Sequence, residues 1–200
     1  MTHLTPEKAL PILCARAKDL SASRAVLAID GMAASGKTTL STALHAAIPK
    51  SAVVHMDDFT LPFDMRFPGY FDALLSNADI QRFDREVLSP FLCGQRAVYR
   101  PYICHPQPGF GEEICIPEDT QLLIVEGAYC LHPMLAPRCA LRVLSLIDPA
   151  LQRQRILQRN GAGQLERFLS MWIPMENRHI QAHDLHAICE WTITSPSAGA

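Results

Sequence analysis

Eight consecutive residues near the start of the chain have the types and spacing needed to hold a polyphosphate: Gly31-Met32-Ala33-Ala34-Ser35-Gly36-Lys37-Thr38. Gly31 and Gly36 permit backbone angles that a side chain would forbid, so successive N–H groups can turn inward around phosphate oxygens. Lys37 is long enough to reach the terminal phosphates, and Thr38 offers a hydroxyl to Mg²⁺. This segment therefore predicts a nucleotide site.

The residues on both sides of this loop have the pattern that such a loop needs. Ala25 to Ile29 is a short, continuous apolar run, as in a strand buried on both faces. From Lys37 onward apolar residues recur at helical spacing. Strand, G-x-x-x-x-G-K-T and helix in that order form the P-loop motif, and residues 31–38 are called the P-loop below. The alternative is a glycine-rich turn leading into a core helix.

Carboxylates follow two other predicted strands. Residues 52–56 predict a strand that runs into Asp57 and Asp58, and the strand predicted over 122–125 ends in Glu126. Open parallel sheets bind ligands at their carboxyl edge. We therefore expect these acids near the P-loop, where they could hold Mg²⁺ or accept the proton of an attacking hydroxyl. For the aspartate pair, the alternative is a solvated turn that caps a helix.

Two segments have compositions typical of loops and lids that close over a bound ligand. Residues 60–79 are rich in proline, glycine and aromatic residues and predict an irregular loop over a small substrate. A later helix carries Arg153, Arg155 and Arg159 and ends at a glycine-flanked turn. We interpret residues 159–166 as a lid that closes arginines over transferring phosphate. A solvated helix face is the alternative for these arginines.

The remaining patterns predict packing elements. Residues 1–23 predict an N-terminal helix that packs against the sheet and has no catalytic role. An apolar stripe late in the chain predicts core packing, in a helix that Pro174 interrupts. Its members are Leu165, Phe168, Leu169 and Trp172. Further strands are predicted at 141–147 and 190–194, and the residues after 194 predict a frayed tail.

Composition limits the class of protein. With 200 residues and 48% hydrophobic content, the chain predicts one globular domain over residues 1–200. Alternating strands and helices predict a three-layer α/β fold, in which helices cover both faces of a mostly parallel sheet of about five strands. A net charge of −2 gives no basis for binding nucleic acid or an anionic membrane. Seven irregularly spaced cysteines and the lack of a long apolar segment favour a cytoplasmic protein with reduced thiols.

With these pieces placed, the chain resembles the uridine kinase family, within the wider group of P-loop small-molecule kinases that includes nicotinamide riboside kinase and pantothenate kinase. The resemblance extends from about Ala25 to Thr194. It rests on GMAASGKTT at 31–39, HMDDF at 55–59, NADIQRFD at 77–84, IVEG at 124–127, RQRILQRNG at 153–161 and FLSMWIPMEN at 168–177. It implies a P-loop NTPase fold and transfer of the γ-phosphate of ATP to a small-molecule alcohol, with a nucleoside 5′-hydroxyl as the leading acceptor.

The resemblance also implies roles for particular residues. Asp57 is similar to the general base for the acceptor hydroxyl, and it would serve Mg²⁺ together with Thr38 and Glu126. Arg155 and Arg159 resemble lid arginines that act with Lys37 in catalysis. The ATP phosphates would be held by Gly31, Ala33, Ala34, Ser35, Gly36, Lys37, Thr38 and Thr39.

On the acceptor side, the resemblance implies fewer contacts. Asp79 looks like the acid that hydrogen-bonds ribose hydroxyls, with Asp72 as its rival, and Tyr102 stands where an aromatic residue contacts the base. Ile103 departs from the family pattern, which usually has an acid after that tyrosine. The acceptor stays open between a nucleoside and another alcohol, such as nicotinamide riboside, pantothenate or a sugar. A P-loop regulator or ATPase is the alternative from another class, and a homo-oligomer is neither predicted nor excluded.

Overall fold

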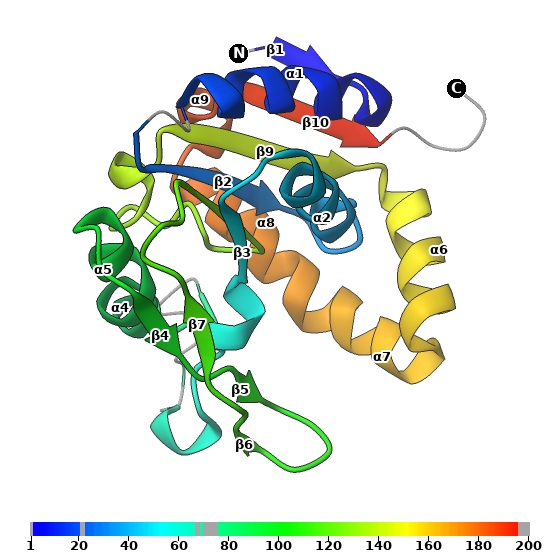
Figure 1. Ribbon diagram of the computed structural model, residues 1–200. Coiled ribbons are helices and arrows are strands. Elements are labelled where there is room, and N and C mark those ends of the chain that lie inside the picture. Colours follow the sequence, from blue (N-terminus) through cyan, green and yellow to red (C-terminus); the bar gives the residue numbers. More distant parts are fainter. Residues whose placement is uncertain (1, 21–22, 67–68, 70–75, 196–200) are drawn as a thin grey trace.

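The structure, a computed structural model, describes residues 2–20, 23–66, 69 and 76–195. Its centre is a six-stranded parallel sheet with the order β1-β10-β9-β2-β8-β3 (Figure 1). The strands are β1 (Thr2–Leu4), β2 (Ala25–Gly31), β3 (Ser51–His55), β8 (Leu122–Glu126), β9 (Leu141–Ile147) and β10 (Trp191–Ser195). The parallel α/β sheet that the sequence predicts is confirmed.

The carboxyl ends of β2, β8 and β3 lie side by side. Ile29 of β2 is opposite Glu126 of β8, and Glu126 is opposite His55 of β3. The P-loop begins at the last residue of β2, and Asp57 lies just beyond β3 in a 3-10 turn, η1 (Met56–Phe59). The parallel register therefore brings the loop and the two strand-ending acids to one edge of the sheet.

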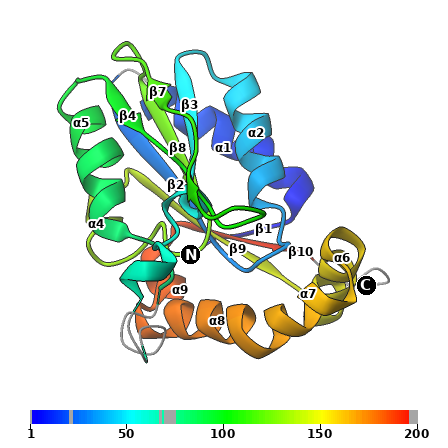
Figure 2. The same ribbon diagram turned by 90° about the horizontal axis from the view of Figure 1, so that it is seen from below.

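Helices cover both faces of this sheet (Figure 2). One face carries α1 (Pro6–Leu20) and α2 (Lys37–Ala47). The other face carries α4 (Ile80–Phe83), α5 (Ser89–Leu92), α8 (Ile173–Ala182) and α9 (Leu185–Ile188). Two more helices, α6 (Pro149–Asn160) and α7 (Ala162–Arg167), form an arm that extends away from the end of β9 (Figure 1). The predicted three-layer arrangement is confirmed.

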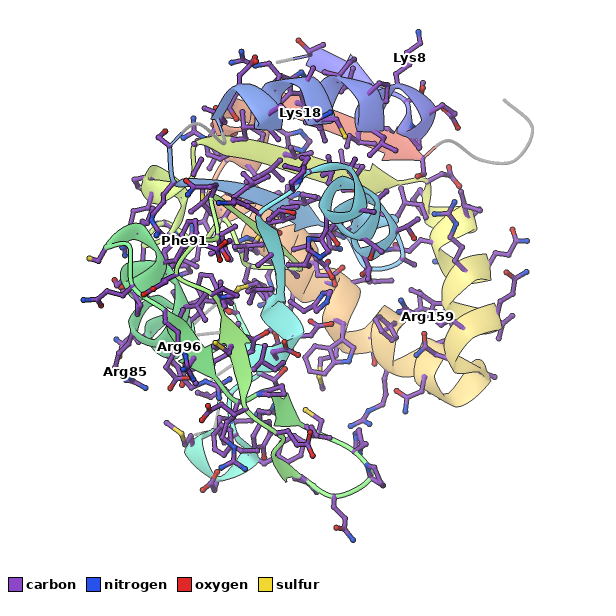
Figure 3. All side chains as sticks on the ribbon, in the orientation of Figure 1. Lys8, Lys18, Arg85, Phe91, Arg96 and Arg159 are labelled. Carbon is purple, nitrogen blue, oxygen red and sulfur yellow. The ribbon has the colours of Figure 1, made fainter. Side chains whose placement is uncertain are left out.

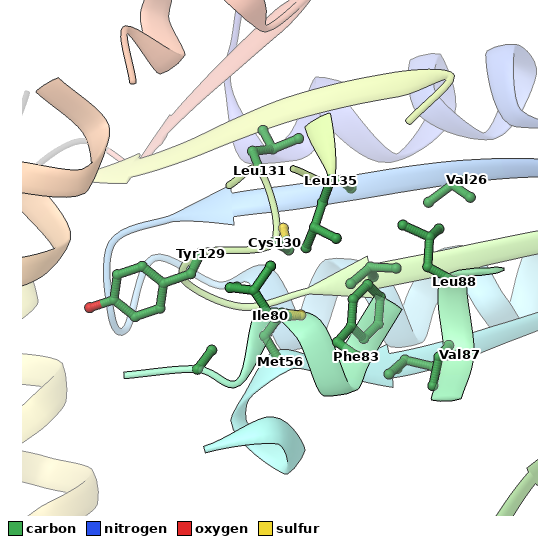
Figure 4. Close-up of a cluster of buried hydrophobic side chains, with 14 of the residues drawn as sticks. Val26, Met56, Ile80, Phe83, Val87, Leu88, Tyr129, Cys130, Leu131 and Leu135 are labelled. Carbon is green, nitrogen blue, oxygen red and sulfur yellow. The ribbon is translucent and has the colours of Figure 1, made fainter. Parts of the chain in front are cut away.

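Two apolar clusters hold the layers together. On one face, Leu13 of α1 and Leu44 of α2 are fully buried in the cluster that contains Leu27 of β2. On the other face, Phe83 is buried in the cluster that contains Val26 (Figure 4). Because neighbouring residues of a strand point to opposite faces, the continuous apolar run of β2 supplies both clusters. This burial fixes the position at which the P-loop leaves the sheet.

Two small antiparallel pairs extend the fold beyond β3. β4 (Ala97–Tyr99) pairs with β7 (Ile114–Ile116), and β5 (Tyr102–Ile103) pairs with β6 (Gly109–Phe110). In the described part of the 60–79 segment, Phe63–Met65 form a 3-10 turn and Thr60 bridges to Ala78. These elements place several aromatic side chains near Asp57, and they are considered with the site.

Two details of the N-terminal and C-terminal helices differ from the sequence prediction. The helix expected over residues 1–23 is preceded by β1, which pairs with β10 as a sixth strand. Pro174 does not interrupt its helix, because α7 continues through a π-helical turn (Phe168–Trp172) into α8. The wider hydrogen-bonding pattern of that turn accommodates a residue that has no backbone N–H.

The apolar stripe expected to pack in the core is not buried. Leu169 is 39% exposed, and neither α7 nor the π-helical turn contains a buried residue. The reason is the position of the arm, which leaves the edge of the sheet and so has no core layer beneath it. The prediction of a core-packing role is wrong, and Phe168 and Trp172 instead line the cavity described below.

Some predictions fall outside the part of the chain that is described. Asp72 belongs to this group, together with the rest of 67–68 and 70–75 in the 60–79 segment and the end of the tail, residues 196–200. Within the described ranges, none of the helices combines the length and the apolar character that crossing a bilayer requires.

Candidate active site

The backbone of the P-loop requires glycine at both of its glycine positions. Gly31 has φ of 132°, and a Cβ atom there would lie 2.0 Å from the carbonyl oxygen of Ser145 in β9. Gly36 has φ of 99° at the start of α2. Lys37 Nζ donates to the carbonyl oxygens of Gly31 at 3.0 Å and Met32 at 2.7 Å. The lysine therefore folds back along the loop and places its charge inside the curve.

Glu126 connects the P-loop helix to the neighbouring strand β3. Its Oε1 accepts a hydrogen bond from Thr38 Oγ1 at 3.0 Å and lies 2.6 Å from Nδ1 of His55. Burial alone would raise the pKa of Glu126, but the His55 contact and the Lys37 ammonium outweigh burial and lower it. The Glu126 contact in turn raises the pKa of His55. Glu126 is thus held ionised beside the Thr38 hydroxyl.

The surroundings of Asp57 shift its pKa in the opposite direction to that of Glu126. Its side chain opens onto the cavity. Desolvation by the surrounding walls and the Glu126 carboxylate raise the pKa of Asp57, an effect that the Lys37 ammonium partly offsets. Asp58, the next residue, faces the interior instead, where its Oδ2 accepts a hydrogen bond from the Tyr99 hydroxyl at 3.0 Å. Of the predicted aspartate pair, the structure therefore brings only Asp57 to the cavity.

Lys37, Thr38, Asp57 and Glu126 line one cavity of about 1720 Å³ at the carboxyl edge of the sheet. That volume exceeds the 300–1,000 Å³ typical of a site for one small ligand, and so it accommodates two. The predicted residues that line it are Ala33, Ala34, Ser35, Gly36, Lys37, Thr38, Thr39, Asp57, Tyr102, Glu126, Arg155 and Arg159. Gly31, the first residue of the loop, does not line the cavity, and its close approach to β9 sets the path of the backbone.

The tip of the P-loop is held by side chains from the arm and from α8. Gln152 Nε2 donates to Ala33 O and Arg155 Nη1 donates to Ala34 O, both at 3.0 Å. Glu176 Oε2 accepts a hydrogen bond from Ala33 N at 2.8 Å. Ala34 has φ of 60°, a left-handed conformation that is costly for a residue with a Cβ. The contacts on both sides of Ala34 hold the peptide groups that fix this conformation.

The two predicted lid arginines differ in their contacts. Arg155 is engaged with the P-loop carbonyl described above. Arg159 is exposed on the arm (Figure 3), where its Nε donates to Asn160 Oδ1 at 2.7 Å. Both side chains line the cavity, as does Arg167 at the end of α7. Arg155 thus supports the P-loop, whereas Arg159 is an exposed residue of the cavity lining.

The predicted acceptor residues are only partly brought together. Tyr102 lines the cavity, and its ring packs edge-on against Phe63 and Phe110 at centroid distances of 6.1 and 5.5 Å. Asp79 does not line the cavity, because its carboxylate caps α4 by accepting the Arg82 N–H at 3.0 Å. Asn77 lines the cavity in its place.

The sequence prediction does not include a buried contact between Asp30 and His179 behind the P-loop. Asp30, just before Gly31, accepts hydrogen bonds from the N–H groups of Gly31, Tyr129 and Leu131 at 2.6, 3.2 and 2.8 Å. Its Oδ2 lies 3.1 Å from Nε2 of His179 in α8. Burial would raise the pKa of Asp30, but His179 and the N–H groups of Leu131 and Gly31 lower it. Asp30 therefore ties the root of the P-loop to the segment after Glu126.

Sequence reasoning missed residues of two kinds. His55 stands directly before the aspartate pair at the end of a predicted strand, and that position could have indicated it. Asp30 likewise stands beside Gly31. Gln152 and Glu176 carry no such signal, because their contacts depend on how the arm and α8 cross the P-loop.

The oxygen ligands at the site fit Mg²⁺. Thr38 and Glu126 present a hydroxyl and a carboxylate next to each other, and Asp57 adds a second carboxylate at the same cavity wall. Within the described residues, no group of three or more histidine, cysteine or acidic side chains could hold a metal ion on its own. Mg²⁺ is usually bound by one or two carboxylates that act together with substrate phosphates.

Comparisons with known proteins agree with this geometry at the level of fold. No protein-family model matches the sequence, and no curated protein matches it. Among solved structures, a possible uridine kinase from Bacillus stearothermophilus matches with a TM-score of 0.69 and 18% identity, over 94% of this chain and 98% of that one.

Two further structures match over most of their length. A protein assigned as a fructose transport system kinase from a Silicibacter species has a TM-score of 0.62 and 24% identity, over 94% of this chain and 99% of its own. Phosphoribulokinase from Rhodobacter spheroides has a TM-score of 0.58 and 13% identity, over 88% of this chain and 71% of its own. The chain therefore has the fold of the P-loop kinases, a group that includes uridine kinase and phosphoribulokinase.

Proposed function

We propose that this chain is an ATP- and Mg²⁺-dependent kinase that transfers the γ-phosphoryl group to a small-molecule alcohol, and that the alcohol is a ribonucleoside attacking through its 5′-hydroxyl. One observation carries the proposal: Asp57 and Glu126, from two neighbouring strand ends, line the same cavity as Lys37 of the P-loop. We take residues 1–200 as one kinase domain, with 60–79 as the acceptor loop and 159–166 as the lid.

The proposed step exchanges one P–O bond for another. The acceptor oxygen forms a bond to the γ-phosphorus while the bond to the β–γ bridging oxygen breaks, and ADP leaves. The hydroxyl proton passes to Asp57, whose raised pKa makes it a stronger base than an ordinary carboxylate. Lys37, with Arg155 and Arg159, offsets the charge on the transferring group, and the P-loop amides position the donor.

Thr38 and Glu126 would hold Mg²⁺, with Asp57 near by, and the ion would neutralise phosphate charge when bound. Glu126 is suited to this role because the Thr38 and His55 contacts fix its carboxylate in the ionised form. Asp57 is suited to a different role, because its raised pKa favours acceptance of the hydroxyl proton. The two acids thus divide the work of cation binding and proton acceptance.

The acceptor side of the cavity supports a nucleoside. Tyr102, Phe63 and Trp172 offer aromatic surface to a base, and Thr60 and Asn77 offer hydrogen-bonding groups to ribose hydroxyls. Asn77 is better placed for the ribose than Asp79, whose carboxylate is used in the helix cap. The alternative is a sugar or sugar phosphate acceptor, since the structural neighbours include kinases named for such substrates.

An acceptor panel tests the proposal. The purified chain is incubated with ATP, Mg²⁺ and one acceptor at a time: uridine, cytidine, adenosine, nicotinamide riboside, pantothenate, fructose or ribulose 5-phosphate. We expect a nucleoside to yield its 5′-monophosphate and one ADP per product, measured by mass spectrometry and ADP release. The matched 5′-deoxynucleoside should yield nothing.

Other outcomes separate the alternatives. Phosphorylation of a sugar but of no nucleoside would replace the nucleoside assignment with the second candidate. ATP hydrolysis that rises with a protein partner, while no acceptor is phosphorylated, would contradict the kinase assignment and favour a regulator.

A further inference from the structure

Two N–H groups of the P-loop donate to carboxylates of different kinds. The Gly31 N–H donates to Asp30, which is buried and does not line the cavity. The Ala33 N–H donates to Oε2 of Glu176, a side chain of α8, at 2.8 Å, and Glu176 does line the cavity. A P-loop binds phosphate through backbone N–H groups of this kind. A carboxylate therefore takes one of the donors that the proposed function gives to ATP.

The surroundings of Glu176 favour its protonated form. Glu176 is 8% exposed, so water screens its charge less than that of a surface carboxylate. Burial raises the pKa of Glu176 to about 7, against the Lys37 ammonium and the loop N–H, and the Asp57 and Asp30 carboxylates raise it further. Arg155 of α6 is engaged with a neighbouring carbonyl oxygen of the loop. Glu176 therefore changes charge near neutral pH, beside the P-loop.

The two charge states of Glu176 differ in what they offer to a triphosphate. The ionised carboxylate repels phosphate and has no proton to donate. The protonated acid is neutral, its carbonyl oxygen still accepts the Ala33 N–H, and its O–H can donate to a phosphate oxygen. Only the protonated form thus keeps the loop contact without opposing the ligand.

We propose that Glu176 competes with the donor nucleotide for the P-loop, and that ATP binds the form of the protein in which Glu176 carries a proton. The inference rests on the proposed function for the identity of the donor, but not on the choice of acceptor. The proton comes from solvent, so ATP binding takes up a proton wherever Glu176 is ionised in the free protein. Donor affinity therefore falls as pH rises through about 7.

Glu176→Gln tests the proposal, because glutamine keeps an acceptor for the Ala33 N–H but carries no charge. ATP is titrated with Mg²⁺ into wild type and variant by calorimetry at pH 8 and at pH 5.5. With a pKa of about 7, roughly one wild-type molecule in ten carries the proton at pH 8, so the variant Kd should be about tenfold lower there. At pH 5.5 the two Kd values should agree within twofold. Comparison of the two proteins cancels the titration of ATP itself.

A control variant and a second readout accompany this titration. Glu118→Gln removes an exposed carboxylate from the turn before β8, at the amino edge of the sheet, and should match wild type at both pH values. Repeating the pH 8 titration in buffers of different ionisation enthalpy counts the protons taken up. Wild type should take up close to one proton more per ATP than Glu176→Gln.

A variant Kd within twofold of wild type at pH 8, weaker binding by the variant, or the same Kd ratio at both pH values would overturn the proposal. The Ala33 contact would then serve only to hold the loop. If neither protein binds ATP at either pH, the proposed kinase function itself fails, and that outcome is distinct from failure of the competition.

Discussion

The donor and acceptor sides of the cavity are built in different ways. On the donor side, a single run of residues from Gly31 to Thr39 supplies the loop, the lysine and the hydroxyl, and buried contacts hold that run from behind. The residues that we propose for the acceptor, including Thr60, Tyr102 and Trp172, line the same cavity but come from segments far apart in the sequence. Under the proposed function, phosphate is recognised by a local backbone shape, whereas the acceptor is recognised by side chains that tertiary structure assembles.

This difference explains why one short sequence motif is enough to predict the proposed phosphate site. A loop that binds through backbone N–H groups depends on glycine at fixed positions, and glycine is visible in a sequence. A pocket built from side chains depends on which segments meet, and that is decided by packing. The predictions below therefore separate effects on the loop from effects on the acceptor.

The largest expected effect is on the donor side. Lys37→Ala removes the ammonium that lies inside the curve of the P-loop and should lower kcat by at least about 10³-fold, as expected for loss of a preorganised charge. Phosphate transfer to the best acceptor of the panel measures it. The acceptor KM should change little, and a variant that keeps a tenth of wild-type turnover would show that the loop is not the donor site.

Asp30→Ala tests the support behind the loop. It leaves three buried N–H groups and His179 without their acceptor and should destabilise the fold by about 3–5 kcal/mol. Urea unfolding measures the loss. Asp30→Asn keeps one carbonyl acceptor and should lose less. A loss below about 1 kcal/mol in Asp30→Ala would mean that the P-loop is not anchored through this pair.

Glu176→Gln tests how the tip of the loop is held. Burial first, and then the Asp57 and Asp30 carboxylates, raise the pKa of Glu176 to about 7, against the opposing effect of Lys37 and the Ala33 N–H. The folded protein therefore binds a proton that the unfolded chain releases at lower pH. The stability from this proton is complete below the ordinary value of 4.5 and is lost as pH rises through about 7.

Glutamine keeps the acceptor for Ala33 N–H but cannot ionise, so the variant should be the more stable protein at pH 8 by up to about 3 kcal/mol. At pH 4 the two proteins should be nearly equal. Thermal unfolding across this pH range measures the difference, with Glu166→Gln, an exposed residue of the arm, as the control. Parallel stability curves for wild type and Glu176→Gln would contradict the account.

The smallest effect is expected on the acceptor side. Trp172→Ala removes an aromatic wall and should raise the acceptor KM about tenfold while the Kd for ATP stays within twofold. Leu169→Ala is the matched control, because Leu169 belongs to the same turn, is exposed and does not line the cavity. Equal effects of the two variants would remove Trp172 from the acceptor site.

The sequence predicts the parallel sheet, the P-loop and the two strand-ending acids because each leaves a local pattern. An apolar run marks a buried strand, as at 122–125, and an acid directly after it must lie at the sheet edge. The same reasoning fails for Trp172, because an apolar stripe has the same spacing whether it meets a core or a cavity. It also fails for Gln152 and Glu176, whose role depends on where one helix crosses another element.

The most direct test of the central claim measures chemistry and donor binding on one variant. Asp57→Asn keeps the size of the side chain but cannot accept the hydroxyl proton. We predict that its single-turnover rate falls by about 10²- to 10⁴-fold while its Kd for ATP stays within threefold of wild type. A rate near that of wild type would contradict the assignment of Asp57 as the base at the cavity shared with Lys37 and Glu126.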